Sequence, residues 1–222
     1  MSRAFSVWTS GALLAAGLWA GCATTSREPA NLTPLKQELI RYVDSGDYDR
    51  DLQAVAERAT TWIELRARSR KPGEQLCVVM DLDETLLRNW AQMRANDFGY
   101  VPAEWSKWVV SGAAPAIEPI RDLYRRTRAL GVDVVFITGR PERHRAATEE
   151  NLRKIECADY AMLICAPDGL KTTAAEFKTD ARRDLVGGGR VIVANVGDQL
   201  SDLTGGFAEK TFKLPNPFYR TN

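Results

Sequence analysis

The feature that most constrains the fold of this chain is an alternation of short apolar runs with longer amphipathic stretches. The runs are LCVVM (76–80), VDVVFIT (132–138), YAMLIC (160–165), RVIVANV (190–196) and TFKLP (211–215). They are rich in β-branched residues, as strands buried on both faces are. Stretches with helical patterns separate them, at residues 117–131, 141–155 and 172–186. This alternation predicts an α/β fold with a doubly wound parallel sheet.

The part of the chain before the first of these runs predicts helices. The pattern is helical from Leu32 to about Ser69, with Thr33 expected as the N-cap and Pro34 as the first helical residue. Apolar residues recur there near helical spacing, among them Leu52, Val55, Ala59, Trp62, Ile63 and Leu65. The stretch KPGEQ (71–75) breaks the pattern. We therefore expect N-terminal helices ahead of the sheet.

Residues 1–21 have the pattern of a secretory signal peptide. One cation in MSR precedes the apolar run GALLAAGLWA (11–20), which is too short for a spanning helix of roughly 20 apolar residues. LWAGC resembles a bacterial lipoprotein box, which implies lipidation of Cys22; plain signal cleavage is the alternative. Residues 22–32 are then a lipidated cysteine and a polar tether, and residues 33–222 form one folded domain.

These features predict a secreted protein of the bacterial periplasm or cell envelope, anchored to a membrane by its lipid. Ala23 carries no acidic retention signal, which is compatible with an outer-membrane destination. The formal net charge of +1 gives no bulk electrostatic reason to bind a nucleic acid polymer or an anionic membrane. The lipid would therefore be the only membrane contact.

The number and spacing of the cysteines bear on disulfide bonds and on zinc binding. After Cys22, the chain contains Cys77, Cys157 and Cys165, and no two of these form a C-x-x-C pair. This odd number argues against a disulfide framework and against a zinc site. Cys77 is most simply a small core residue, and the sequence leaves open whether Cys157 and Cys165 pair.

Acidic side chains follow two of the predicted strands. Asp81 and Asp83 come directly after the first, and Asp198 and Asp202 follow the fourth. Ligands of doubly wound sheets bind beyond the carboxyl ends of the strands, so we expect these carboxylates to share one edge. A divalent cation among them makes the repulsion tolerable, and such hard oxygen ligands suit Mg²⁺.

The order of these motifs resembles that of a known family. Asp-x-Asp-x-Thr (81–85), a Thr after the second strand, a downstream Lys and Gly-Asp-x-x-x-Asp (197–202) resemble the haloacid dehalogenase (HAD) superfamily of phosphohydrolases. The stretch from EFKTDARRDL (176–185) to LPNPFY (214–219) is similar to class B and plant vegetative-storage-type acid phosphatases, and to bacterial lipoprotein acid phosphatases. The likeness runs from roughly Leu35 to Tyr219. It implies a HAD-like phosphatase domain, Mg²⁺ as cofactor and small phosphomonoester substrates.

The spacing of the first two acids suits phosphoryl transfer. A carboxylate can attack a phosphoryl group in line and form an aspartyl phosphate, and we assign this role to Asp81. Two residues along an extended chain a side chain returns to the same face, so Asp83 can reach the reacting group. Asp83 would protonate the leaving oxygen and then activate water as the general base.

The resemblance implies roles for the remaining motif residues. The metal would be held by side-chain oxygens of Asp81 and Asp198 and by the backbone carbonyl of Asp83. Thr138 would donate a hydrogen bond to a phosphoryl oxygen. Asp202 would not bind the metal directly but would orient the lysine or a metal-bound water.

The resemblance also implies a lysine that neutralises the charge of the phosphoryl group and the carboxylates, and Lys171 and Lys178 are the two candidates. Arg140 and His144 need an assignment as well. Similarity of EFKTDARR to the lysine segment of the family favours Lys178 over Lys171. Arg140 could contact phosphate, but we favour a structural ion pair. His144, the only histidine, lies in a polar helical stretch and is expected to be solvated.

The insert at about residues 88–115 predicts a small helical cap. Trp90, Phe98 and Tyr100 could stack on a substrate ring or form the core of the cap, and the sequence leaves both open. Trp105 and Trp108 share a helix face, and for them we favour a place in the core. A short cap leaves the site open, which indicates broad specificity that includes nucleoside monophosphates.

Three other functions compete with an acid phosphatase. A non-catalytic storage or binding protein of this family would have lost the nucleophile, whereas Asp81 is present. A phosphotransferase would use the same residues, and a lipoprotein could serve in adhesion. Dehalogenases lack the second Asp, so Asp83 argues against that reaction.

Overall fold

The computed structural model describes residues 29–221, and all the helices and strands given below lie between Leu32 and Lys213. The predicted signal peptide (1–21), the lipidation site Cys22 and tether residues 23–28 lie outside the described residues. No helix within residues 29–221 is long and apolar enough to cross a bilayer.

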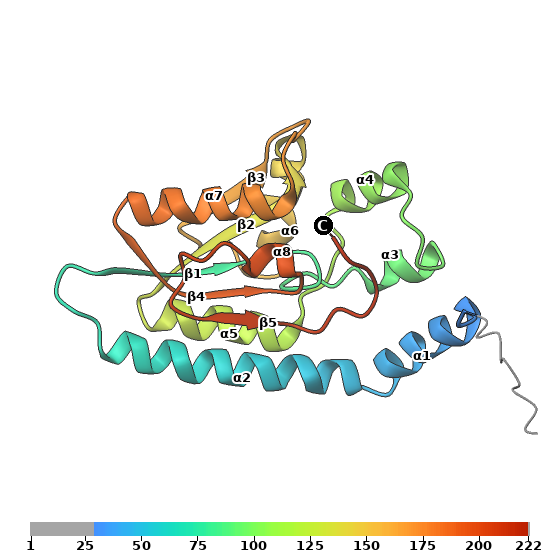
Figure 1. Ribbon diagram of the computed structural model, residues 1–222, viewed down its shortest axis with the longest axis horizontal. Helices are drawn as coiled ribbons and strands as arrows, with labels where there is room; N and C mark the ends of the chain where they lie inside the picture. The colour runs from blue at the N-terminus through green and yellow to red at the C-terminus, as the bar shows by residue number, and fades with distance from the viewer. Residues whose placement is uncertain (1–28, 222) are drawn as a thin grey trace, which may run out of the picture. The chain divides into compact units, whose positions relative to one another are not determined.

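A parallel five-stranded sheet forms the centre of the fold, in the order β3-β2-β1-β4-β5 (Figure 1). Its strands are β1 (Gln75–Met80), β2 (Asp133–Pro141), β3 (Met162–Ala166), β4 (Arg190–Gly197) and β5 (Thr211–Lys213). Met80 at the end of β1 pairs with Phe136 and with Val196, so the central strands end close together. The predicted α/β fold with a parallel sheet is confirmed.

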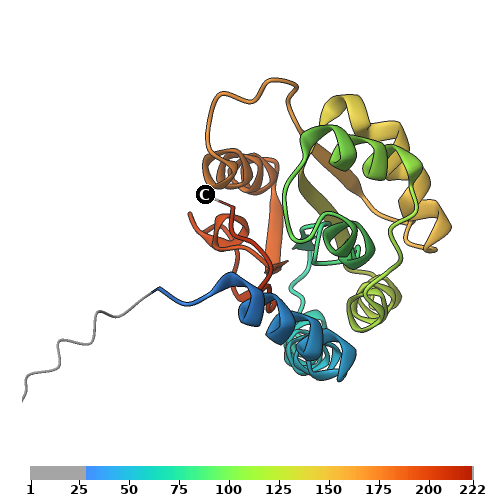
Figure 2. The ribbon, with the colours of Figure 1, turned by 90° about the vertical axis from the view of Figure 1, so that its right-hand side faces the viewer.

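Helices cover both faces of the sheet. They are α2 (Asp47–Arg68), α5 (Glu118–Ala129), α6 (Arg145–Lys154), α7 (Ala174–Gly187) and the short α8 (Leu200–Leu203), and α1 (Leu32–Asp44) packs against α2. Figures 1 and 2 show α2 and α5 side by side on one face and α7 on the other. Helix α1 begins at Leu32, so the expected N-cap at Thr33 is wrong and this residue lies inside the helix.

The central strand has apolar side chains on both faces. Val78 and Met80 belong to the core cluster that includes residues of α2 and α5, whereas Cys77 and Val79 pack in a second cluster with residues of α7. Successive side chains of a strand point to opposite faces. A continuous apolar run is therefore what a strand between two helical layers needs.

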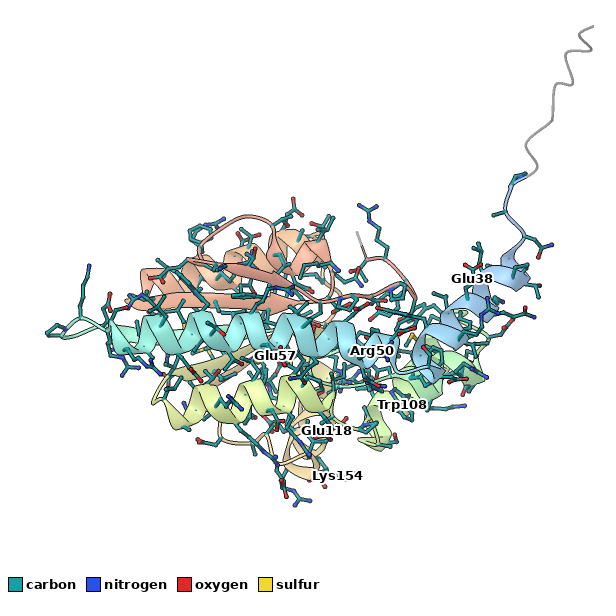
Figure 3. The ribbon with its side chains drawn as sticks, turned by 90° about the horizontal axis from the view of Figure 1, so that it is seen from below. Glu38, Arg50, Glu57, Trp108, Glu118 and Lys154 are labelled. Carbon is teal, nitrogen blue, oxygen red and sulfur yellow. The ribbon has the colours of Figure 1, made fainter. Side chains whose placement is uncertain are left out.

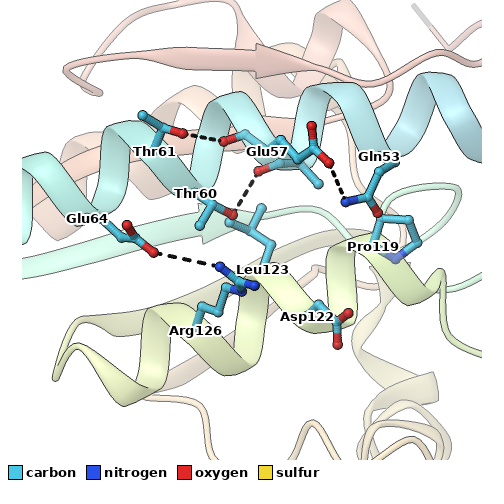
Figure 4. A pocket seen from close by; sticks show the side chains of 10 residues that line it. Gln53, Glu57, Thr60, Thr61, Glu64, Pro119, Asp122, Leu123 and Arg126 are labelled. Atoms are coloured by element: carbon cyan, nitrogen blue, oxygen red, sulfur yellow. Dashed lines mark hydrogen bonds and ion pairs between the residues drawn. The ribbon is translucent and has the colours of Figure 1, made fainter.

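The groove between α2 and α5 is polar, as Figure 4 shows, and most of its side-chain contacts join nearby residues of α2. Gln53 donates to Glu57 at 2.9 Å, and the Thr60 hydroxyl donates to the Ala56 carbonyl at 2.9 Å. This groove is separate from the ends of β1 and β4, and none of the residues that line it also lines the cavity described below.

The insert between β1 and α5 contains α3 (Trp90–Ala95) and α4 (Pro102–Ser111), and we call these two helices the cap lobe. Helix α4 packs against α6, near a 3₁₀ turn at Glu142–His144. His144 in this turn is 5 % exposed, and its Nε2 lies 3.1 Å from the Ser106 hydroxyl on α4. The expectation of a solvated histidine is therefore wrong, because the cap lobe covers what looks locally like a polar surface.

Three cysteines within the described residues are buried free thiols, namely Cys77, Cys157 and Cys165. Cys157 and Cys165, whose pairing the sequence left open, are therefore not bridged. Burial raises the pKa of the Cys77 and Cys157 thiols to about 12, which keeps them protonated and unreactive at neutral pH.

Candidate active site

The ends of β1 and β4 bring three carboxylates together. Asp81 follows β1, and its backbone N–H donates to the Val196 carbonyl of β4 at 3.0 Å. Side-chain oxygens of Asp81, Asp198 and Asp202 all lie within 4.8 Å of one another, and all three residues are buried. The sequence predicted that these acids gather at one edge of the sheet, and the structure places them there.

Lys178 of α7 lies between two of these acids. Its Nζ contacts Asp81 Oδ1 and donates to Asp202 Oδ1 at 2.6 Å, and all three side chains are at least nine-tenths buried. A capping box between Thr173 and Glu176 begins α7, and Lys178 lies on the buried face of this helix. Lys171 is exposed in the preceding loop. The structure brings Lys178, and not Lys171, to the expected nucleophile.

Each remaining carboxylate oxygen of Asp202 and Asp198 has protein donors. Asp202 Oδ2 accepts from the Gln199 backbone N–H at 2.8 Å. Asp198 Oδ1 accepts from the Thr85 hydroxyl at 3.0 Å, and its Oδ2 accepts from the side-chain amides of Gln199 and Asn216, both at 2.7 Å. Asp81 differs, because no donor within residues 29–221 reaches its Oδ2. The uncommitted oxygen therefore belongs to the predicted nucleophile.

Charge at this site is not balanced by protein groups alone. Burial raises the pKa of Asp81 well above its usual range, and Lys178 only partly offsets this effect. Burial also raises the pKa of Asp198, to which the charge of Asp202 adds. Burial alone would lower the pKa of Lys178, but Asp81 and Asp202 outweigh it and the pKa is raised.

The donor set fits a hard divalent cation. Asp81 and Asp198 supply two buried carboxylates close together, and both would lose their tendency to protonate beside a cation. Asp202 accepts from Lys178 on one oxygen and from the Gln199 backbone N–H on the other. This agrees with its expected role of orienting the lysine.

Asp83 is held by a buried ion pair. Arg140 donates from Nη2 to Asp83 Oδ1 at 2.6 Å and from Nε to Oδ2 at 3.0 Å, and its side chain is 1 % exposed. The structural ion pair favoured from the sequence is present, although Arg140 also lines the cavity above the acids.

Thr138 lies within β2, at the point where its register against β3 shifts, and the strand continues to Pro141. Its hydroxyl accepts from the Arg140 backbone N–H at 3.1 Å. The side chain is fully buried and does not line the cavity, whereas Gly139 does. Its contact with a phosphoryl oxygen stays a prediction.

A cavity of about 490 Å³ opens over the acids. Phe98, Tyr100 and Trp105 of the insert line one part of it, and Phe218 and Tyr219 line another. Trp105 therefore lies on the cavity wall, and the preference for a core position is wrong for this residue.

The other two tryptophans of the insert do not line the cavity. Trp90 packs against Phe98 and Phe218, with ring centroids 5.7 and 5.3 Å apart, which is the packing role that the sequence left open beside a substrate contact. Trp108 packs against the core, as expected. Tyr100 is 72 % exposed, so the wall is open on its side.

The sequence model of the HAD superfamily, subfamily IIIB (Acid phosphatase), matches residues 1–222. The chain belongs to this family. It is 40 % identical over 190 residues to Acid phosphatase 1 of Solanum lycopersicum, covering 83 % of this chain and 68 % of that protein. It is 29 % identical over 195 residues to Vegetative storage protein 1 of Arabidopsis thaliana, covering 86 % and 71 %.

A solved structure supports the same assignment of this acid phosphatase. The class C acid phosphatase from Bacillus anthracis superposes with a TM-score of 0.67 at 26 % identity, covering 83 % of this chain and 86 % of that one. The resemblance inferred from the motifs is confirmed, both for the superfamily and for the acid phosphatases within it.

The sequence did not indicate a place for Glu84 in the site of this acid phosphatase. Glu84 has a left-handed backbone (φ 56°) and accepts from the Asn89 backbone N–H at 2.7 Å and from the Tyr219 hydroxyl at 2.9 Å. Burial raises the pKa of Glu84 to about 8, and the charge of Asp83 adds to this. The third acid of DLDET was a visible signal, but nothing local indicates a partner near the C-terminus.

Proposed function

We propose that this acid phosphatase hydrolyses small phosphomonoesters through an aspartyl phosphate on Asp81, with Mg²⁺ as cofactor. The observation that carries the proposal is the contrast between the two Asp81 oxygens. Lys178 contacts Oδ1, whereas Oδ2 has no donor within residues 29–221 and is available to attack. A fixed, charge-compensated carboxylate with one uncommitted oxygen is what in-line attack on phosphorus requires.

The reaction then divides into two half-reactions. Asp81 Oδ2 forms a bond to phosphorus while the bond from phosphorus to the ester oxygen breaks, and Asp83 gives its proton to that oxygen. In the second half-reaction Asp83 takes a proton from water, whose oxygen attacks phosphorus and releases Asp81. Lys178 keeps its positive charge beside Asp81 and reduces the repulsion between this carboxylate and the phosphoryl oxygens.

Side-chain oxygens of Asp81 and Asp198, with the Asp83 backbone carbonyl, would hold the Mg²⁺. When bound, the ion would supply positive charge to the equatorial phosphoryl oxygens. Asp202 would keep Lys178 in place through the 2.6 Å contact between Asp202 Oδ1 and Nζ. The raised pKa values of Asp81 and Asp198 support this, because a cation would relieve the cost of burying both as anions.

The cavity supports small, exposed phosphomonoesters as substrates, nucleoside monophosphates among them. Its volume of about 490 Å³ suits a compact leaving group, and Phe98 and Tyr100 offer aromatic surface for a ring. The open side at Tyr100 favours broad specificity over recognition of one large substrate.

Activity and metal dependence are tested with p-nitrophenyl phosphate. Hydrolysis is expected to cease in EDTA and to return with Mg²⁺. In Asp83→Asn, formation of the aspartyl phosphate should outpace its hydrolysis, which predicts a burst of about one equivalent of p-nitrophenolate per enzyme. Hydrolysis that is unaffected by EDTA would contradict the metal. Transfer of phosphate to an added alcohol in preference to water would instead indicate a phosphotransferase.

The N-terminal assignment belongs to the same proposal. We propose that Cys22 is lipidated after removal of residues 1–21 and anchors a secreted enzyme in the cell envelope. Incorporation of labelled palmitate into the full chain, and its loss in Cys22→Ala, is the expected result. Release of an unlabelled, soluble protein by the unaltered chain would instead indicate plain signal cleavage.

A further inference from the structure

The side-chain amide of Asn89 connects the general acid to the cap lobe. Asn89 lies between β1 and α3 and is fully buried. Its Nδ2 donates to Asp83 Oδ1 and to Glu84 Oε2, both at 3.0 Å, and its Oδ1 accepts from the Trp108 indole N–H at 2.7 Å. Both amide hydrogens and the amide oxygen therefore have partners on three different residues.

The surroundings allow only one orientation of this amide. An indole N–H can only donate, so the atom that faces Trp108 must be the amide oxygen. The amide nitrogen then faces two carboxylates, which accept from it. Glu84 also accepts the Asn89 backbone N–H at 2.7 Å, so the backbone and side chain of Asn89 are held by the same acid. A flipped amide would place its oxygen against Asp83 and Glu84.

This arrangement makes the two oxygens of Asp83 unequal. Oδ1 accepts from Asn89 and from Arg140 Nη2, at 3.0 and 2.6 Å. Among the donors of residues 29–221, only Arg140 Nε reaches Oδ2, at 3.0 Å, and it also lies 3.2 Å from Oδ1. The oxygen with fewer donors is the one better able to carry a proton, because a proton on Oδ1 would compete with two N–H groups that already point at it.

We propose that Asn89, held by Trp108, is a positioning residue that turns Asp83 so that Oδ2 carries the proton delivered to the leaving oxygen. The inference rests on the proposed function, in which Asp83 is the general acid. As the bond from phosphorus to the ester oxygen breaks, the proton moves from Oδ2 to that oxygen and Asp83 becomes a carboxylate. Asn89 itself touches no reacting atom.

Through the hydrogen bond from Trp108, the cap lobe helps to hold Asn89 in place. Trp108 lies on α4, where Figure 3 labels it, and its ring packs against the core. Trp62 on α2 does not line the cavity, and its indole N–H donates to the Val193 carbonyl of β4 at 2.8 Å. The two tryptophans therefore offer a matched pair, one joined to Asn89 and one not.

The dependence of rate on the leaving group separates positioning from general damage. p-Nitrophenolate leaves without a proton, whereas the alcohol of glycerol 2-phosphate needs one, so a misplaced acid affects the alkyl ester selectively. kcat/KM covers the steps up to departure of the alcohol, and hydrolysis of the intermediate does not enter it. The measured quantity is the ratio of kcat/KM for the two substrates, with Mg²⁺ present.

Asn89→Ala is expected to lower kcat/KM for glycerol 2-phosphate about tenfold more than for p-nitrophenyl phosphate. Trp108→Phe keeps a ring but removes the N–H, and should shift the ratio in the same direction by about threefold. Trp62→Phe is the same chemical change away from the cavity and should leave the ratio unaltered. If Asn89→Ala does not fold, the two tryptophan variants decide.

Equal losses on both substrates in Asn89→Ala and Trp108→Phe would overturn the inference, as would an equal shift in Trp62→Phe. Asp83→Asn is the reference. A selective loss there on glycerol 2-phosphate, without one in Trp108→Phe, overturns the positioning role and leaves the proposed function intact. Equal losses in Asp83→Asn remove Asp83 as the acid, and both proposals fail together.

Discussion

The side chain of Asp202 packs directly against the backbone of Gly197: a Cβ on Gly197 would lie 2.5 Å from Asp202 Cβ and 2.5 Å from its Oδ2. Only a glycine allows this approach, and Asp202 in turn contacts Lys178 at 2.6 Å. The glycine that ends β4 therefore sets the position of the lysine beside Asp81.

Gly197→Ala is expected to displace Asp202 and to destabilise the fold by about 1–3 kcal/mol, as overpacking of a buried site does. Urea unfolding measures the change, and p-nitrophenyl phosphate hydrolysis should fall with it. Gly187→Ala is the control, because a Cβ there has no atom within 4 Å. Equal stabilities of the two variants would show that the site accommodates the extra methyl group.

Lys178→Met should be strongly destabilising, because it leaves the buried Asp81 and Asp202 without their cation. Removing one partner of a buried ion pair costs about 3–5 kcal/mol, and turnover should be lost as well. Lys171→Met changes an exposed residue and should alter neither quantity. Urea unfolding in EDTA and p-nitrophenyl phosphate hydrolysis check this, and the reverse result would move the catalytic role to Lys171.

Asp81→Asn should abolish turnover while the protein stays folded. The substitution removes the attacking carboxylate, so kcat should fall at least about a thousandfold. Circular dichroism and thermal unfolding check the fold. Asp184→Asn on exposed α7 surface is the matched control and should keep full activity. Turnover near the unaltered level in Asp81→Asn would end its assignment as nucleophile.

His144 predicts a pH dependence of stability. Burial lowers its pKa from the usual 6.5, and the neighbouring charges of Arg143 and Arg140 lower it further, while Asp168 acts in the opposite direction. The folded state therefore prefers the neutral ring. This contribution is fully present above pH 6.5 and is lost as the pH falls from 6.5 through the lower pKa of the folded state.

His144→Gln should remove this dependence. The free energy of unfolding of the unaltered protein minus that of the variant should decrease as the pH is lowered from about 7.5 to about 5. Other titrating groups are common to both proteins and cancel in the difference. Since the chain has no other histidine, a constant difference over this range would show that the pKa of His144 is not lowered by folding.

The strands, most of the helices and the acids at the strand ends could be predicted because their signals are local. An unbroken apolar run such as LCVVM indicates burial on both faces, and parallel strands end at a shared edge, so Asp81 and Asp198 had to be close. The choice of Lys178 needed the resemblance, since nothing local distinguishes a buried lysine on α7 from a solvated one.

The features that the sequence predicted wrongly or missed depend on contacts between distant parts of the chain. Trp105 and Trp108 share a helix face, but one lines the cavity and the other donates to Asn89. His144 is covered by α4, from a segment well before it in sequence. The partner of Glu84 is Tyr219, 135 residues away.

The order of residues alone determined which acids this phosphatase has and at which edge of the sheet they gather, because hydrophobic periodicity and strand direction are properties of short segments. The tertiary structure alone decided which donor each acid receives: Lys178 for Asp81, Arg140 and Asn89 for Asp83, Tyr219 for Glu84. A hydrogen bond depends on positions within a few tenths of an ångström. Only the packing of the whole chain sets distances that finely.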